Sequence, residues 1–244
     1  MSAEIYVGTS GFYYRHWVGI FYPPDLPKSR WLEYYMEHFN TLEINSTFYR
    51  TPSSKTIERW SELAKEGFLY SLKAPRIITH YKKLQDCRED VEAFLNLLQP
   101  LKPKVGAVLF QLPPSLHYDL KLLKNFLDIL PPLYPYAVEF RHKSWYEEEV
   151  YELLKNKNIA FCIHDFSRRQ TPFVVTADFI YIRFHGKNGR YIGSYDDEVL
   201  ANWAQKIKEA AKREEVKRIF CYFNNDFYGY AIKDARRLIS LLKS

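Results

Sequence analysis

The stretch Tyr-Ala-Val-Glu-Phe-Arg at residues 136–141 decides the fold, because it is an apolar run that becomes charged where it ends. Side chains of a β-strand alternate between two faces, so Glu139 and Arg141 share one face. The other face carries Val138 and Phe140, which argues against a strand with one solvated side. The pattern predicts a buried strand whose inner face becomes polar at its carboxyl end.

Seven further apolar runs also end in polar or charged residues, and helical segments separate them. Such alternation of strands and helices predicts parallel pairing. A closed barrel of parallel strands explains why both faces are apolar and why one end is polar, and enzymes built on such barrels have their chemistry at that end. We therefore expect an α/β fold, a single (β/α)8 TIM-like barrel over residues 1–244. The eight runs lie near Ile5–Thr9, Thr41–Asn45, Phe68–Lys73, Val105–Gln111, Tyr136–Arg141, Ile159–His164, Phe179–His185 and Arg218–Asn224.

The segments between the runs contain recognisable helix starts. Ser53 precedes an apolar pattern at helical spacing, and Ser144 with Glu147 has the spacing of a capping box. The sixth crossover, from Asp165 to Asp178, is short and contains Pro172. We expect this crossover to be abbreviated, with at most one or two helical turns.

Chain length, apolar runs, cysteine spacing and net charge limit the classes of protein to which the chain can belong. The 244 residues match the roughly 250 of an eight-stranded α/β barrel, and no linker suggests a domain boundary. A strand begins almost at the N-terminus and no apolar run nears about 20 residues, so we expect a cytoplasmic protein without a signal peptide or membrane contact. The three cysteines lack the spacing of a zinc or disulfide framework. A formal charge of +6 favours an anionic partner.

Five cationic side chains fall at or after the strand ends and predict an anion clamp. Barrels frequently bind phosphate with loops after the seventh and eighth strands, where arginine supplies paired donors. The glycine-containing segment 186–195 also has the length of a mobile lid. The alternative is an ion-pair network in which Glu43 and Glu139 neutralise the buried cations. The five cations are Lys73, Arg141, Arg183, Lys187 and Arg190.

Acid–base side chains fall at the same strand ends. A carboxylate and a histidine in one polar pocket can differ in pKa, so Glu139 and His185 are the candidates for proton transfer. Lys73 can contact an anion or form a Schiff base. We expect an enzyme of hydrolase or lyase type that acts on a small phosphate-bearing or carbohydrate-like anion, with no oligomeric state assigned. The other substrate-binding candidates are Glu43, Asn45, Gln111, His164 and Asn224.

Two alternatives use the same residues differently. Net positive charge with the aromatic segment 11–27 fits a nucleic-acid-binding barrel, including a metal-dependent phosphodiesterase. The aromatic residues of that segment either stack on bases or cover the barrel end. Histidines near carboxylates permit a divalent metal, but no HxH or HExxH pairing occurs, so no cofactor is predicted. The second alternative is a sensor that binds a small anion without chemistry.

Several motifs, in order along the whole chain, resemble the YecE-like family of uncharacterised proteins. The resemblance implies a TIM barrel. It implies no activity and no catalytic residues, because the family is known mainly as a domain of unknown function. The motifs are Gly8-Thr9-Ser10-Gly11, Glu43-Ile44-Asn45-Ser46-Thr47-Phe48-Tyr49, Lys73-Ala74-Pro75 with Thr79-His80, Gln111-Leu112-Pro113-Pro114, Glu139-Phe140-Arg141-His142 with Trp145, Arg183-Phe184-His185-Gly186 and Phe223-Asn224-Asn225-Asp226.

Overall fold

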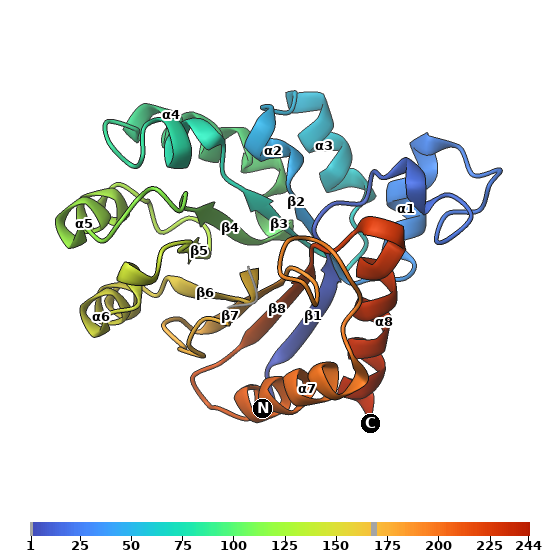
Figure 1. Ribbon diagram of the computed structural model, residues 1–244. Helices are drawn as coiled ribbons and strands as arrows, with labels where there is room; N and C mark the ends of the chain where they lie inside the picture. Colours follow the sequence, from blue (N-terminus) through green and yellow to red (C-terminus); the bar gives the residue numbers. More distant parts are fainter. Residues whose placement is uncertain (1, 167–169) are drawn as a thin grey trace. The chain divides into compact units, whose positions relative to one another are not determined.

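Strands and helices alternate along the chain in the computed structural model, which describes residues 2–166 and 170–244 (Figure 1). The strands are β1 (Glu4–Thr9), β2 (Thr41–Ile44), β3 (Leu69–Lys73), β4 (Val105–Gln111), β5 (Tyr136–Glu139), β6 (Ala160–His164), β7 (Phe179–Phe184) and β8 (Arg218–Phe223). The α-helices are α1 (Trp31–Met36), α2 (Ser46–Tyr49), α3 (Ser54–Leu63), α4 (Arg88–Leu97), α5 (Leu120–Asp128), α6 (Glu148–Asn156), α7 (Asp197–Ala211) and α8 (Tyr230–Lys243).

The strands form one parallel sheet in the order β1-β8-β7-β6-β5-β4-β3-β2. β1 pairs with β8 along its whole length, from Glu4 opposite Arg218 to Thr9 opposite Phe223. A parallel bridge between Ser10 and Glu43 then joins the end of β1 to β2, so the first and last strands of the order meet. This is the nearly closed, TIM-like barrel that the strand pattern predicted.

Contacts divide the chain into two compact units. Unit 1 comprises residues 1–43, 163–173 and 178–244, and unit 2 comprises 44–162 and 174–177. The prediction of one domain over residues 1–244 stays a prediction.

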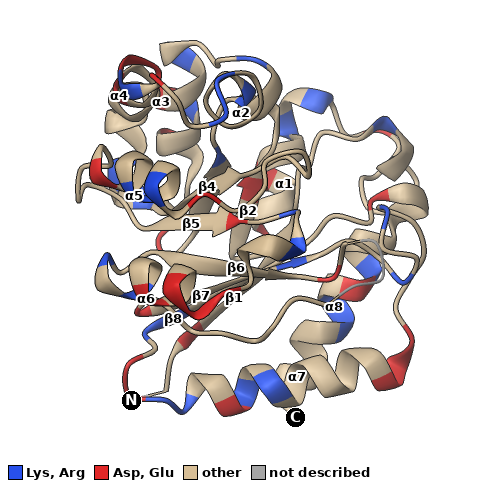
Figure 2. Ribbon diagram, turned by 60° about the vertical axis from the view of Figure 1, so that its left-hand side comes forward, with Lys and Arg blue, Asp and Glu red and all other residues tan. Residues whose placement is uncertain are grey.

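Unit 1 contains β1, β7 and β8, with α8 packed along β1 and against α7 (Figure 1). α7 begins with the acidic residues Asp197 and Glu198, which suit the positive end of a helix dipole (Figure 2). Three aromatic rings of the segment before α1 are buried, those of Trp17, Phe21 and Tyr22, and Tyr22 stacks on Trp31 at 4.5 Å between ring centroids. Other residues of the segment are exposed, among them Tyr13 at 57%, so only part of the segment is core.

Unit 2 contains β3, β4 and β5 with helices α2 to α6. Directly after β3 the chain forms a π-helix, Ile77–Tyr81, in which the Lys82 N–H donates to the Ile77 carbonyl at 2.9 Å. A π-helix is rare and occurs often at functional sites. No spacing in the sequence indicated one here.

The predicted helix starts have mixed outcomes. Ser53 caps α3 as expected, and its side chain accepts a hydrogen bond from the Thr56 N–H. The capping box at Ser144 is wrong: α6 begins at Glu148, and the Ser144 N–H donates instead to His142 Nδ1. In a capping box the Glu147 side chain would accept from the Ser144 N–H, but the neighbouring His142 imidazole accepts from it instead.

The sixth crossover contains no α-helix among residues 165–166 and 170–178, in line with the expected abbreviation. Its remaining part, 167–169, lies outside the described residues. Within the described ranges, no helix has the length and hydropathy that a membrane span requires.

Candidate functional site

In unit 2, polar side chains gather at the carboxyl ends of β3, β4 and β5. Lys73 ends β3, and its Nζ donates to Gln111 Oε1, at the end of β4, at 2.8 Å. The same ammonium lies 3.9 Å from the ring centroid of Phe48. Both polar side chains are 8% exposed, so the positive charge lies in a largely dehydrated setting. A cation there interacts more strongly with an anion than it would in water.

A second cation of this cluster is held by a carboxylate. Arg141 Nε donates to Glu139 Oε1, and the two side chains are 5% and 0% exposed. Cys162 Sγ lies 3.8 Å from Glu139 Oε2. The pairing orients the guanidinium of Arg141, whose fork of donors suits planar anions. Two predicted site residues, Glu139 and Arg141, are therefore in contact with each other.

His80, on the π-helix, belongs to the same cluster. Its Nδ1 lies 2.8 Å from Thr79 Oγ1, and its ring meets Phe48 edge-on at 4.9 Å. Burial lowers the pKa of His80 from 6.5 to about 4, with further lowering by Lys73 and Arg141 and a partial offset by Glu139. The imidazole is therefore neutral at pH 7, at a point where the local potential is positive.

This pKa predicts a pH dependence of stability. The folded pKa of His80, about 4, lies below the ordinary 6.5, so the unfolded chain takes up the proton first as pH falls. Stability from this residue is complete above pH 6.5 and is lost between about 6.5 and 4. We expect a loss of about 2 kcal/mol between pH 7 and 4.5, after discounting for partial exposure. Urea unfolding of the native chain and of His80→Gln at both pH values measures this loss.

The variant is the control for that measurement. Glutamine does not titrate, so His80→Gln should lose about 2 kcal/mol less than the native chain across the same interval. Equal losses in the two proteins would assign the acid sensitivity to other groups.

In unit 1, Glu43 and Arg183 form a fully buried ion pair. Arg183 Nη2 donates to Glu43 Oε1 at 2.8 Å and Nε donates to Oε2 at 2.9 Å, with the two side chains 0% and 1% exposed. The Tyr181 hydroxyl donates to Glu43 Oε2 at 2.7 Å, and Ser10 Oγ donates to Oε1. The ion pairs of that alternative are thus present for Glu43 with Arg183 and for Glu139 with Arg141, and anion binding by either arginine stays a prediction.

A carboxylate, an imidazole and a phenol meet at the ends of β6 and β7. Asp165 Oδ1 accepts from the His185 backbone N–H at 2.7 Å and lies 3.5 Å from His185 Nδ1. The Tyr195 hydroxyl donates to Asp165 Oδ2 and accepts from the Gly186 N–H at 2.8 Å. Burial and Asp165 raise the pKa of Tyr195 well above 10. Asp165 is thus hydrogen-bonded to the backbone of His185 and to Tyr195, with its carboxylate near the imidazole of His185.

The segment after β7 differs from an open anion cradle. The N–H groups of Gly186, Asn188, Gly189 and Tyr191 all donate to acceptors within the segment or to Tyr195. Lys187 Nζ pairs with Asp196 Oδ2 at 2.9 Å, with both side chains more than half exposed. These four backbone N–H groups therefore already have acceptors within the protein, unlike the free donors of an anion cradle.

The remaining predicted residues lie at or just after strand ends. Asn224, after β8, is 8% exposed, and Arg190 is exposed in the segment after β7. His164 is buried, and its Nδ1 accepts from the Phe166 N–H at 3.2 Å while its ring meets His185 edge-on at 5.8 Å. Asn45, in unit 2, directly precedes α2, and its buried Oδ1 has no hydrogen-bond partner among the described residues.

Sequence reasoning did not select several residues that complete these clusters. The residues are Ser10, Phe48, Tyr181 and Tyr195, whereas His80 and Asp165 were considered only among the histidines and carboxylates that permit a metal. Among the described residues, no group of three or more His, Cys, Asp or Glu side chains is placed to hold a metal ion. The metal alternative stays a prediction.

Comparison with known proteins places the chain in a family. The family model described as "Protein of unknown function DUF72" matches residues 6–244. The chain belongs to the DUF72 family. A DUF72 protein of Thermotoga maritima has a solved structure that is similar over 99% of this chain and 100% of its own, with a TM-score of 0.89 and 32% identity. A DUF72 protein of Enterococcus faecalis covers 98% of this chain and 96% of its own, with a TM-score of 0.83 and 21% identity.

Two curated DUF72 relatives are similar in sequence. The UPF0759 protein YunF of Bacillus subtilis is 26% identical over 98% of this chain and 94% of its own length. The UPF0759 protein YecE of Escherichia coli is 35% identical over 52% of this chain, and the match spans about half of YecE, 47%. These comparisons confirm the family resemblance and the TIM-like fold.

Proposed function

We propose that this DUF72 protein is an enzyme that binds a small anionic substrate at the carboxyl ends of β3 to β5 and moves a proton on it. One observation carries the proposal: the Lys73 ammonium and the His80 ring both pack on Phe48, at 3.9 and 4.9 Å from its ring centroid, so a buried cation lies beside a neutral imidazole. A phosphate or carboxylate group near that imidazole would be attracted to both cations, Lys73 and Arg141. The cluster is also largely buried, which strengthens the attraction.

Each side chain of the cluster has a role in this proposal. Lys73 and Arg141 hold the anion, and Glu139 keeps the guanidinium in place. Gln111, which accepts from Lys73 through Oε1, fixes the ammonium. His80 transfers the proton, because a neutral imidazole can accept one and return it later.

Substrate binding would itself tune the proton-transfer group. Burial, together with the two cations, lowers the pKa of His80 to about 4, where an imidazole is a weak base, and an anion can offset only the part that the cations contribute. An anion between them would offset their potential and raise that pKa toward neutrality, where general acid–base catalysis is most effective. The base would then gain strength only when substrate is present. The π-helix that carries His80 is an independent feature typical of functional sites.

The test uses inorganic phosphate as the probe and the His80 imidazole as the reporter. We expect phosphate to raise the pKa of His80 by at least one unit, followed by NMR of the ring protons. Arg141→Gln should weaken phosphate binding at least tenfold, while the exposed Arg88→Gln should leave it unchanged. If Arg141→Gln proves unstable because Glu139 is left unpaired, Glu139→Gln with Arg141→Gln removes both charges together.

An unchanged pKa of His80 at saturating phosphate would contradict anion binding at this cluster. Proton transfer is tested separately, with mixtures of phosphate esters and hydroxy acids followed by ³¹P and ¹H NMR. Conversion by the native chain but not by His80→Gln, with phosphate affinity retained in the variant, is the expected result. Equal conversion by both proteins would remove His80 from the chemistry.

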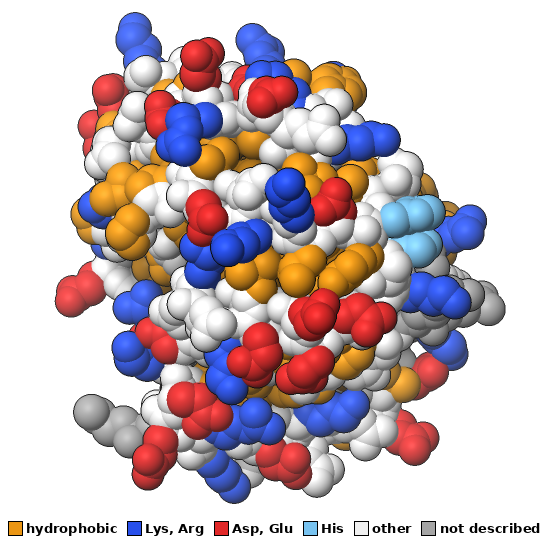
Figure 3. Space-filling view, turned by 90° about the vertical axis from the view of Figure 1, so that its left-hand side faces the viewer, with side chains coloured by type: hydrophobic (Ala, Val, Ile, Leu, Met, Phe, Trp, Pro, Cys, Tyr) orange, Lys and Arg blue, Asp and Glu red, His pale blue; other side chains and the backbone are white. Residues whose placement is uncertain are grey.

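The proton-transfer groups predicted from the sequence were Glu139, which pairs with Arg141, and His185, which lies 3.5 Å from Asp165 in unit 1. A catalytic role for either residue stays a prediction. The nucleic-acid alternative would be supported by a stripe of basic residues. On the face shown in Figure 3, lysines and arginines are interspersed with acidic residues.

A further inference from the structure

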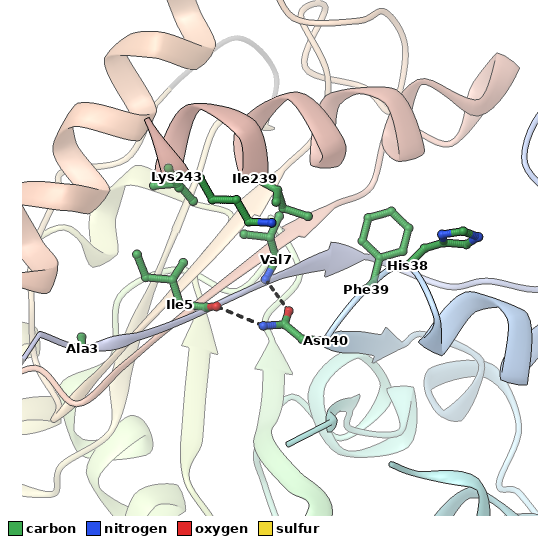
Figure 4. Close-up of a pocket in the computed structure, with 9 residues that line it drawn as sticks. Ala3, Ile5, Val7, His38, Phe39, Asn40, Ile239 and Lys243 are labelled. Carbon is green, nitrogen blue, oxygen red and sulfur yellow. Dashed lines mark hydrogen bonds between the residues drawn. The ribbon is translucent and has the colours of Figure 1, made fainter. Parts of the chain in front are cut away.

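A groove of about 460 Å³ lies in unit 1, outside the clusters described above (Figure 4). Its floor is the outward face of β1, and its two walls are α8 and the segment before β2. Sites for small molecules commonly have volumes of about 300–1,000 Å³. Its lining includes Ile5, Val7, Phe39, Asn40, Ile239 and Lys243.

The groove exists because α1 is short. Its six residues extend about 9 Å, whereas the six residues of β1 extend about 20 Å. α1 reaches the carboxyl end of β1, where the Tyr35 hydroxyl accepts from the Thr9 N–H at 2.8 Å. The earlier part of β1, around Ile5, is left without a helix above it on that side.

The Asn40 side chain hydrogen-bonds the backbone groups of β1 in the part of the strand that α1 does not cover. The Val7 N–H donates to Asn40 Oδ1 at 3.1 Å, and Asn40 Nδ2 donates to the Ile5 carbonyl at 3.1 Å (Figure 4). An added peptide strand needs free backbone groups on the strand it joins. Those groups are occupied here, so the groove suits an apolar chain better than a peptide.

The wall that α8 forms carries a positive charge. Lys243 extends along it, with its ammonium directed toward Ile239 and Val7 (Figure 4). Burial and the charge of Arg236 lower the pKa of His38, so that imidazole is neutral at pH 7. Lys243 is therefore the charged lining residue at neutral pH. Its long stem also adds apolar surface to the wall.

We propose that this groove binds a medium-chain carboxylate, with the alkyl chain against Ile5, Val7 and Phe39 and the carboxylate at Lys243. Apolar lining along the floor and a single cation above it match an unbranched acyl chain with one anionic end. The site lies in unit 1 and is independent of the anion cluster proposed for unit 2.

The full chain is titrated with hexanoate, octanoate and decanoate, each below its micelle concentration, and amide shifts are followed by NMR. Shifts are expected at Val7, Phe39 and Asn40, with affinity rising about fourfold per methylene until the groove is filled. Octan-1-ol, which lacks the charge, should bind about threefold to fivefold more weakly than octanoate.

Variants assign the contacts. Ile239→Trp fills the groove and should abolish octanoate binding, and Lys243→Ala should reduce it about threefold to fivefold. Lys233→Ala, an exposed lysine on the same helix outside the groove, should bind like the native chain. Octanoate binding at native affinity by Ile239→Trp would overturn the site.

Equal affinity for octanol and octanoate would overturn the carboxylate assignment. Groove shifts that depend on protein concentration, with a dimer in size-exclusion chromatography, would identify a second copy of the chain as the occupant instead.

Discussion

Glu43→Gln is expected to lower the free energy of unfolding by about 3–5 kcal/mol, the cost of breaking a buried ion pair. The substitution leaves the guanidinium of Arg183 buried without its carboxylate, and Tyr181 and Ser10 lose a charged acceptor. Little of this loss can be recovered by hydration, because neither side chain of the pair exceeds 1% exposure. Urea unfolding at pH 7 measures the change.

Two further variants separate burial from charge. Glu33→Gln removes one partner of an exposed pair with Arg30 and should cost less than about 0.5 kcal/mol. Glu43→Leu combined with Arg183→Met removes both buried charges and should be more stable than Glu43→Gln alone. A loss below 1 kcal/mol for Glu43→Gln would show that the pair contributes far less than its burial indicates.

Asp234→Asn is expected to destabilise the chain by about 3 kcal/mol and to loosen the segment between β7 and α7. Asp234 is fully buried on α8 and accepts from Ser194 Oγ at 2.6 Å, the Tyr195 N–H at 3.1 Å and Asn225 Nδ2 at 2.8 Å. Its Oδ1 also pairs with Arg237 at 2.9 Å. An amide has one acceptor atom in place of two and directs its NH₂ group at these donors.

The chain offers a matched control on the same arginine. Asp197 also pairs with Arg237, but its side chain is 96% exposed. Asp197→Asn should therefore cost less than about 0.5 kcal/mol and leave the segment unchanged. Hydrogen exchange of the Tyr195 amide, combined with urea unfolding, tests both variants. Exchange that is equally slow in Asp234→Asn would mean that other contacts hold the segment.

The barrel could be predicted because its signal is repeated eight times in the sequence. Each strand alternates with period two, and the change from apolar to polar marks the carboxyl end directly. For this reason Lys73, Gln111 and Glu139 were assigned to strand ends, and the structure has each as the last residue of its strand. A strand end fixes the position of a side chain along the barrel.

Strand position does not determine the partner of a side chain. Arg141 and Arg183 were assigned to an anion, yet each donates to a glutamate of its own unit. The pairing depends on where a guanidinium on a flexible stem can reach, which spacing does not encode. The Asp165 contact with His185 was also not anticipated. Asp165 lies one residue after the end of β6, so the alternation of side chains along the strand does not predict where its carboxylate points.

The pKa of His80 could not be predicted from the sequence either, for a third reason. Its pKa depends on burial and on two cations that lie 7 and 61 positions away in the chain, at Lys73 and Arg141. Periodicity reports which face a residue occupies within one element. It does not report the electrostatic potential produced by other elements.

The π-helix Ile77–Tyr81 makes chain length a determinant of the candidate site. A π-turn closes over one residue more than an α-turn, as the Lys82 to Ile77 hydrogen bond shows. Deleting one residue would return the turn to α-helical geometry and rotate the side chains after the deletion by about 100°. In this chain the number of residues between β3 and His80 is therefore as much a determinant of the candidate site as the imidazole itself, because one residue more or fewer would redirect the ring.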